Sequence, residues 1–341
     1  MAITFNQQPD KIRSIYNELN YLSTSTNSAE CNFKYVYDLY EKSTANNWVL
    51  AGRFKIPIRP VTSEGIFDAH RVLESYVEFD ATGNTITGFT NNAKSLISYK
   101  VAVGEEFDDS ANCNTGTTIY STSFQTGATL FGFGNVLQHN TFNDWAFTDY
   151  ILTGSTSSFL TAQPADKKIR TGEYETISFL NGNFNDSIIS SGASIVFEKY
   201  NSSDSSLGTY TISNSNSAST NIDQLHQSAG VGVGNLNAGN PGFIDSNVSY
   251  YTCKMVNSGA DTSLTQRFTI DDSCNDFEPV RVCWLNRNGG KDYFTFLGMQ
   301  YNDLSMKPKT FNQIKWDSDG LKYSYGLGDR GIKNISNRIT K

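Results

Sequence analysis

The chain has 341 residues, a formal net charge of −7 and no apolar stretch long enough to predict a membrane span. The excess of acidic residues argues against a nucleic-acid-binding body, because contact with phosphates requires clustered Lys and Arg. Aromatic residues make up 13% of the sequence and charged residues only 18%, a balance that favours strands and turns over helices. The length predicts two domains, or one domain with a large elaboration.

The first 30 residues are polar and carry no secretion signal, and we expect them to form an N-terminal arm. From Cys31 the pattern changes. CNFKYVYDLY, from residue 31, alternates with a period of two, and WVLAGRFKIPIRP, from residue 48, supplies a partner strand that ends in prolines. Residues 66–77 have a spacing near that of a short helix. We predict a first β-rich domain over residues 31–104.

Residues 105–170 are predicted to form an irregular connecting segment, which opens with the acidic stretch EEFDD and contains Trp145, a candidate contact for a glycan. Over residues 171–300, about seven short strands separated by Ser, Asn and Gly turns predict a second domain, an Ig-like β-sandwich. The polar, glycine-rich residues 213–243 are expected to be a mobile loop or arm, and residues 301–341 a C-terminal extension. The predicted fold is therefore mainly β, with two β-sandwich (Ig-like) domains joined by an irregular segment, short helices and extended arms.

The most organised stretch is VCWLNRNGGKDYFTF, residues 282–296. A glycine-bearing loop after an apolar run can cradle a phosphate, but only if a helix follows it. Here a strand composition follows, and the Asn-Gly-Gly sequence can supply the positive φ values of a tight hairpin. Both faces are apolar, which predicts a strand pair that is covered on both sides. The residues of this structural hairpin are Trp284, Asn288, Gly289, Gly290, Phe294 and Phe296.

The sequence predicts no catalytic, cofactor or metal site. The histidines His70, His139 and His226 form no His-x-x-x-His pair, and the cysteines form no Cys-x-x-Cys pair. Five widely spaced cysteines predict buried thiols in a reducing cytoplasm rather than disulfides. GVGVG at 230–234 lacks the expected strand and helix of a dinucleotide site and predicts a flexible loop. The acidic pairs at 105–109 and 271–272 are interpreted as a charged loop and a turn, in preference to glycosidase carboxylates.

The combination VRVCWLNRNGGKDYFTF, preceded by FTIDDSC and far upstream by FKYVYDLY, FKIPIRP and GIFDAHRVLESYV, resembles a family of virion structural proteins of tailed bacteriophages. These proteins are tail- or baseplate-associated and common in phages of Bacteroidetes-like and marine hosts. The resemblance spans most of residues 31–300, and its motifs concern packing and turns.

The resemblance implies a structural component of the tail, baseplate or neck that is not an enzyme and needs no cofactor. Its implied partners are copies of itself, expected in a ring, and other virion proteins, within a virion assembled in the host cytoplasm. The alternatives are a receptor-binding tail-tip or fibre protein that recognises a host surface glycan, and a head-surface decoration protein. A polysaccharide depolymerase is disfavoured, because no long repetitive β-helical sequence is found.

Overall fold

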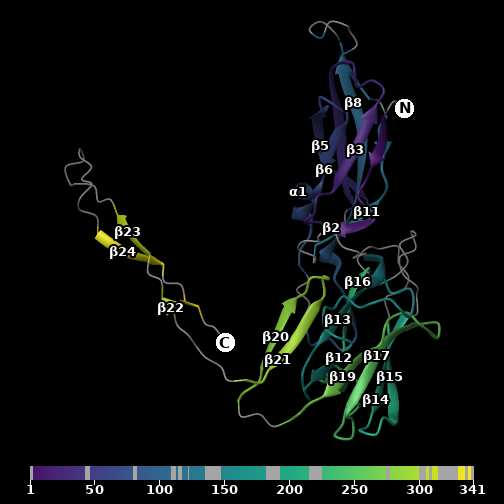
Figure 1. Ribbon diagram of the computed structural model, residues 1–341, viewed down its shortest axis with the longest axis vertical. Coiled ribbons are helices and arrows are strands. Elements are labelled where there is room, and N and C mark those ends of the chain that lie inside the picture. The colour runs from purple at the N-terminus through teal and green to yellow at the C-terminus, as the bar shows by residue number, and fades with distance from the viewer. Residues whose placement is uncertain are drawn as a thin grey trace. The chain divides into compact units, whose positions relative to one another are not determined.

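The computed structural model shows a protein that is mainly β, with several sheets and few short helices (Figure 1). Two compact units are formed, one by residues 1–272 and 283–294 and the other by residues 273–282 and 295–341. The residues that the structure describes are 3–42, 47–79, 83–108, 113, 117–121, 123–134, 147–181, 193–214, 225–273, 277–298, 305–306, 309–313, 329–334 and 337–338.

A first pair of sheets in the larger unit encloses one aromatic-rich core. The smaller sheet has the order β1-β3-β6, and the larger has the order β2-β11-β8-β4-β5, with β9 and β10 also paired to β8. The alternating residues of β4 that the period of two predicts, among them Tyr35 and Tyr37, face this core. The strands are β1 (Ile3–Gln7), β2 (Ile12–Ser14), β3 (Asn20–Ser25), β4 (Cys31–Lys42), β5 (Trp48–Pro57), β6 (Gly65–Asp68), β8 (Leu96–Asp108), β9 (Thr118–Tyr120), β10 (Gln125–Thr126) and β11 (Leu130–Phe133). A short helical segment, α1 (His70–Leu73) and η1 (Glu74–Tyr76), follows β6.

Residues 3–25 belong to this core, so the expectation of an N-terminal arm is wrong. β1 pairs with β3, β3 pairs with β6, and β2 runs parallel to β11. Ile15, Leu19 and Tyr21 are fully buried. The stretch looks polar because its buried apolar side chains are few and are spread over short strands, and two of these strands, β2 and β3, have partners from much later in the chain.

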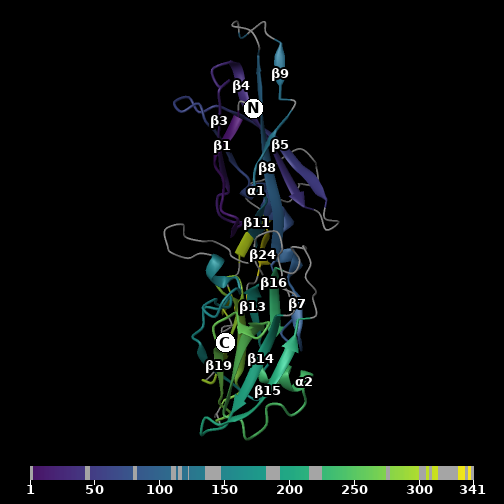
Figure 2. The same cartoon turned by 90° about the vertical axis from the view of Figure 1, so that its right-hand side faces the viewer.

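A second pair of sheets lies in the part of the larger unit that holds β13, β14, β16 and β19 (Figure 2). Its core contains Phe197, Tyr251 and Phe268 from the larger sheet and Ile177 and Phe179 from the smaller. The larger sheet has the order β12-β19-β17-β14-β15, with β18 paired to β17, and the smaller has the order β13-β16-β7. The strands are β7 (Phe89–Asn91), β12 (Asp166–Ile169), β13 (Thr176–Leu180), β14 (Ala193–Tyr200), β15 (Ser206–Ser213), β16 (His226–Gly230), β17 (Tyr250–Asn257), β18 (Ala260–Asp261) and β19 (Gln266–Ile270). Two further 3-10 segments are η2 (Ala93–Ser95) and η3 (Phe147–Tyr150).

Strand pairing crosses the boundaries drawn from the sequence. β7, from the segment assigned to the first domain, pairs with β16. β11, from the segment assigned to the irregular connection, pairs with β8.

Most of the described part of residues 213–243 is buried structure, with residues 225–236 all buried, which corrects the expectation of a mobile loop. All of β16 is buried, and α2 (Val233–Gly239) follows it, so GVGVG does lie between a strand and a helix. Its glycines allow close packing: a Cβ at Gly230 would lie 2.0 Å from the Ile86 carbonyl oxygen. His226 is fully buried, and its Nδ1 lies 2.7 Å from Ser95 Oγ. Residues 215–224 lie outside the described residues.

The cysteines also depart from the prediction. Cys31 and Cys113 form a disulfide, and Cys283 is exposed, whereas Cys253 is a buried thiol as expected. Cys274 lies outside the described residues. The prediction was wrong because it relied on the wide spacing of the cysteines in the sequence. β4 and β8 pair with each other, which brings Cys31 opposite Asp108 and so close to the segment that contains Cys113.

In the smaller unit, the described stretches of the C-terminal extension form two antiparallel pairs. β22 (Ser305–Met306) pairs with β25 (Asn337–Arg338), and β23 (Lys309–Gln313) pairs with β24 (Asp329–Asn334). Among the described residues, no helix is both long and apolar enough to cross a membrane.

Candidate interaction site: the hairpin of β20 and β21

A hairpin forms where the Asn-Gly-Gly sequence predicts one. β20 (Val280–Leu285) and β21 (Lys291–Phe296) make a two-stranded sheet (Figure 1). The backbone N–H of Asn286 donates to Gly290 O at 2.9 Å, and Gly289 has a φ of +90°. Gly290 is required for a different reason: a Cβ there would lie 1.9 Å from Leu160 O. The turn therefore depends on one glycine for its backbone angle and on the next for close contact.

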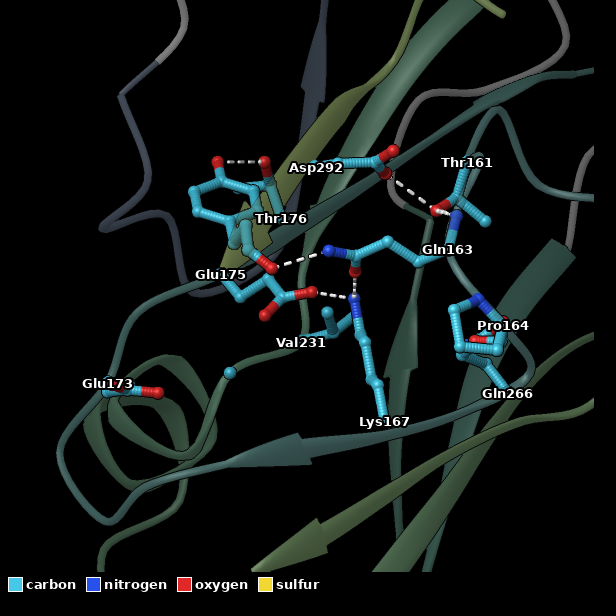
Figure 3. Close-up of polar contacts among 12 residues, drawn as sticks. Thr161, Gln163, Pro164, Lys167, Glu173, Glu175, Thr176, Val231, Gln266 and Asp292 are labelled. Atoms are coloured by element: carbon cyan, nitrogen blue, oxygen red, sulfur yellow. Dashed lines mark hydrogen bonds and ion pairs between the residues drawn. The ribbon is translucent and has the colours of Figure 1, made fainter. Parts of the chain in front are cut away.

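The turn residues Asn286 and Asn288 are buried and are held in a socket formed by residues 160–163. Asn286 Nδ2 donates to Leu160 O at 2.9 Å, and Asn288 Nδ2 donates to Thr161 O at 2.8 Å. Asp292, which is 1% exposed, accepts from Thr161 Oγ1 at 2.6 Å, as Figure 3 shows, and from the N–H of Ala162 at 3.1 Å. Hydrogen bonds to a buried carboxylate are among the stronger ones, so this end of the hairpin is fixed.

A buried ion pair extends the socket below the hairpin. Lys167 Nζ donates to Gln163 Oε1 at 2.8 Å and also to Glu175 (Figure 3). Gln163 Nε2 in turn donates to the carbonyl oxygen of Tyr293 in β21. The Tyr293 hydroxyl lies 2.8 Å from Thr176 Oγ1, and burial raises the pKa of this tyrosine. The network thus links β12 and β13 to β21 through polar side chains that satisfy one another.

The hydrogen bonds of the socket and the Lys167–Glu175 ion pair hold the hairpin in place. The carboxylates of Asp292 and Glu175 both accept hydrogen bonds from protein donors. Over the part of the chain that the structure describes, no group of three or more His, Cys, Asp or Glu side chains could hold a metal ion.

The strands beyond the turn expose aromatic side chains, which corrects the prediction that both faces are covered. Trp284 is 41% exposed and Phe294 is 52% exposed. The Asn286–Gly290 hydrogen bond sets a register that places Trp284 opposite the buried Asp292. Val282 and Phe296, further along the same strands, are also exposed. An apolar strand composition indicates burial in some environment, and it cannot distinguish a core from an interface.

The other sequence candidates lie elsewhere. Trp145 and His139 fall outside the described residues. His70 Nδ1 lies 2.6 Å from Asp68 Oδ2. Asp271, which directly follows β19, accepts from Lys168 Nζ at 2.8 Å through its Oδ2. The acidic stretch from residue 105 is not a loop, because β8 continues through Glu106 to Asp108.

The residues that the sequence did not single out are those of the socket: Thr161, Gln163, Lys167, Glu175, Asn286 and Asp292. Each is a common surface residue type, so no local signal marks it as buried. The only available hint is the position of Asn286 and Asp292 beside the predicted turn.

Comparison with models of protein families finds no match, and a search of the curated proteins finds none at a significant level. The fold and the site define the chain only as a mainly β protein with a rigidly anchored, aromatic hairpin.

Proposed function

We propose that this chain is a structural component of a tailed-phage virion, in the tail, baseplate or neck, that binds copies of itself and other virion proteins. As part of the same proposal, the two pairs of packed sheets belong to the Ig-like β-sandwich class. The observation that carries the proposal is the hairpin of β20 and β21. It presents Trp284 and Phe294 to solvent on strands whose turn is fixed by buried hydrogen bonds. The resemblance of the hairpin sequence to virion structural proteins supports the same assignment.

The exposed rings are large enough to matter in an interface. An exposed fraction of 41% for Trp284 corresponds to roughly 100 Å² of side-chain surface, and Phe294 exposes about as much. Burying each at about 25 cal/mol/Å² contributes about 2.5 kcal/mol. That is the range of an interface hot spot, in which Trp is over-represented. A fixed hairpin also loses little conformational freedom on association.

The test is the mass of the full chain in solution, measured by light scattering over a range of concentrations. We expect the native chain to form a closed oligomer and the Trp284→Ala/Phe294→Ala double variant to dissociate to monomers. Leu207→Ala is the matched control, because Leu207 is an exposed apolar residue on a different strand, β15. Urea unfolding of each variant checks that the fold is retained.

Either of two outcomes would contradict the proposal. A native chain that stays monomeric at every concentration would refute self-association. An oligomer that survives the double variant would show that the hairpin is not its interface.

A further inference from the structure

The outer face of the seven-stranded sheet, on the side away from its core, carries cations and aromatic rings in alternation. The register sets Lys42 opposite Trp48 and Tyr40 opposite Lys100 across β4, β5 and β8. Because side chains alternate across a strand, these residues lie on the face opposite Tyr35 and Tyr37. We call this face the outer strip, and its members are Lys34, Tyr40, Lys42, Trp48, Arg53, Lys55, Lys100, Tyr120 and Phe124.

One end of the outer strip is built around Trp48. The ammonium of Lys100 lies 4.4 Å from the centroid of the Trp48 ring and 5.6 Å from that of Tyr40. The ammonium of Lys42 lies 5.9 Å from the centroid of the same Trp48 ring. Neither lysine has an ion pair with a carboxylate in the part of the chain that the structure describes. Two positive charges are therefore held by rings instead of by counter-charges.

The middle of the outer strip is different, because its cations meet carboxylates. Arg53 Nε donates to Asp38 Oδ1 at 2.6 Å and Arg53 Nη2 donates to Asp38 Oδ2 at 2.7 Å. Lys55 Nζ lies 2.5 Å from Glu106 Oε2. Both carboxylates are nearly buried beneath these cations.

Rings border the middle of the outer strip as well. The Arg53 guanidinium lies 5.2 Å from the centroid of the Phe124 ring. The Lys55 ammonium lies 5.4 Å from the centroid of the Tyr120 ring. Aromatic surface is thus present along the whole face, next to donors and acceptors.

The charge of this face has the opposite sign to that of the chain. Among the described residues of this face, five cations, Lys34, Lys42, Arg53, Lys55 and Lys100, outnumber the carboxylates of Asp38, Glu106 and Asp108, and 5 − 3 leaves +2. The whole chain carries −7. A cationic face on an acidic protein attracts an anionic partner and selects against neutral ones.

We propose that the outer strip binds a carbohydrate chain that carries carboxylate or sulfate groups. Trp48 and Tyr40 supply rings against which the apolar faces of sugars stack, and Lys42 and Lys100 bind the anionic substituent. A nucleic acid fits less well, because a dense phosphate backbone needs more uncompensated cations than +2. This inference concerns a surface that the hairpin does not use, and it goes beyond the proposed assembly role.

The test is titration calorimetry of the full chain with alginate oligosaccharides, which carry carboxylates, and chondroitin sulfate oligosaccharides, which also carry sulfates. Neutral dextran oligosaccharides and single-stranded poly-dT are the comparison ligands. We expect binding to at least one acidic oligosaccharide, weakened by salt, and no binding to dextran. Trp48→Ala and Lys42→Gln/Lys100→Gln should each weaken binding by about tenfold or more.

The matched control is Lys168→Gln/Lys254→Gln, which removes two lysines from the other large sheet and should leave the affinity unchanged. Binding by Trp284→Ala/Phe294→Ala should also be unchanged, which separates this inference from the assembly proposal. Failure to bind either acidic oligosaccharide, or equal affinity in the outer-strip variants, would overturn the proposal. Tighter binding of poly-dT would overturn it in favour of a nucleic-acid site.

Discussion

The disulfide between Cys31 and Cys113 provides a direct test of the fold. It ties the start of β4 to a residue 82 positions later in the chain. Replacing both residues by Ser removes this cross-link from the unfolded chain. In the chain-entropy treatment, a loop of 82 residues lowers the entropy of the unfolded chain by roughly 15 cal/mol/K, which is about 4.5 kcal/mol at 25 °C.

The assay is urea unfolding followed by tryptophan fluorescence, on the oxidised chain and on Cys31→Ser/Cys113→Ser. With a slope of about 3 kcal/mol/M, the loss corresponds to a fall in the midpoint of roughly 1.5 M. Cys283→Ser is the control, because it replaces an exposed cysteine and leaves the Cys31–Cys113 disulfide in place, so its midpoint should stay close to that of the oxidised chain. Equal midpoints for the oxidised chain and the double variant would refute the reasoning. So would alkylation of both Cys31 and Cys113 in the untreated native chain.

Three further predictions concern buried polar groups. Glu175→Gln removes the counter-charge of the buried Lys167 and should lower the free energy of unfolding by about 3–5 kcal/mol, measured with urea. Asp292→Ala removes two charged hydrogen bonds at the hairpin and should cost about 3 kcal/mol in the same assay, while an unchanged midpoint would place Asp292 in solvent. Burial raises the pKa of Cys253 from 9.0 to about 12 and that of Tyr35 from 10.0 to about 12. As the pH rises, these two groups lose their protons in the unfolded chain before they do so in the folded chain. Their contribution to the free energy of unfolding is therefore full below about pH 9 and is lost as the pH rises towards 12. Urea midpoints that hold steady from pH 8 to 11 would contradict this prediction.

The elements that the sequence predicts well are those whose signal is local. The period of two in residues 31–40 and the prolines after the partner strand indicate β4 and β5, and both form as an antiparallel pair. The hairpin turn is likewise signalled by its own Asn-Gly-Gly residues, and Gly289 supplies the positive φ.

The predictions that fail depend on partners distant in the sequence. Leu19 and Tyr21 are buried because they pack in one core with residues such as Tyr99, which come much later in the chain. Gly230 lies in a glycine-rich run, which is typical of a mobile loop. In the structure this position requires glycine because the Ile86 carbonyl oxygen lies where a Cβ would be. Asp292 has the composition of a surface residue, and only the fold shows that residues 160–163 cover it.

The socket holds the hairpin through polar side chains. A two-stranded hairpin is only marginally stable alone, so β20 and β21 need an anchor. Apolar residues could provide similar stability, since a buried ion pair is often no better than well-packed hydrophobic side chains of the same volume. Polar contacts such as those of Asn286 and Asp292 differ in being directional, and they fix the orientation of the strands as well as their attachment.

A fixed orientation matters if Trp284 meets a copy of the same chain, because a closed ring forms only when the angle between neighbours is constant. The double variant Lys167→Met/Glu175→Leu replaces the whole Lys167–Glu175 ion pair by apolar side chains. It should therefore change the free energy of unfolding far less than Glu175→Gln alone, which leaves Lys167 without its counter-charge. We expect this double variant to weaken self-association in light scattering, since Gln163 loses its contact with Lys167 and orients Tyr293 less firmly. A double variant that folds and associates like the native chain would show that the polar socket has no part in assembly.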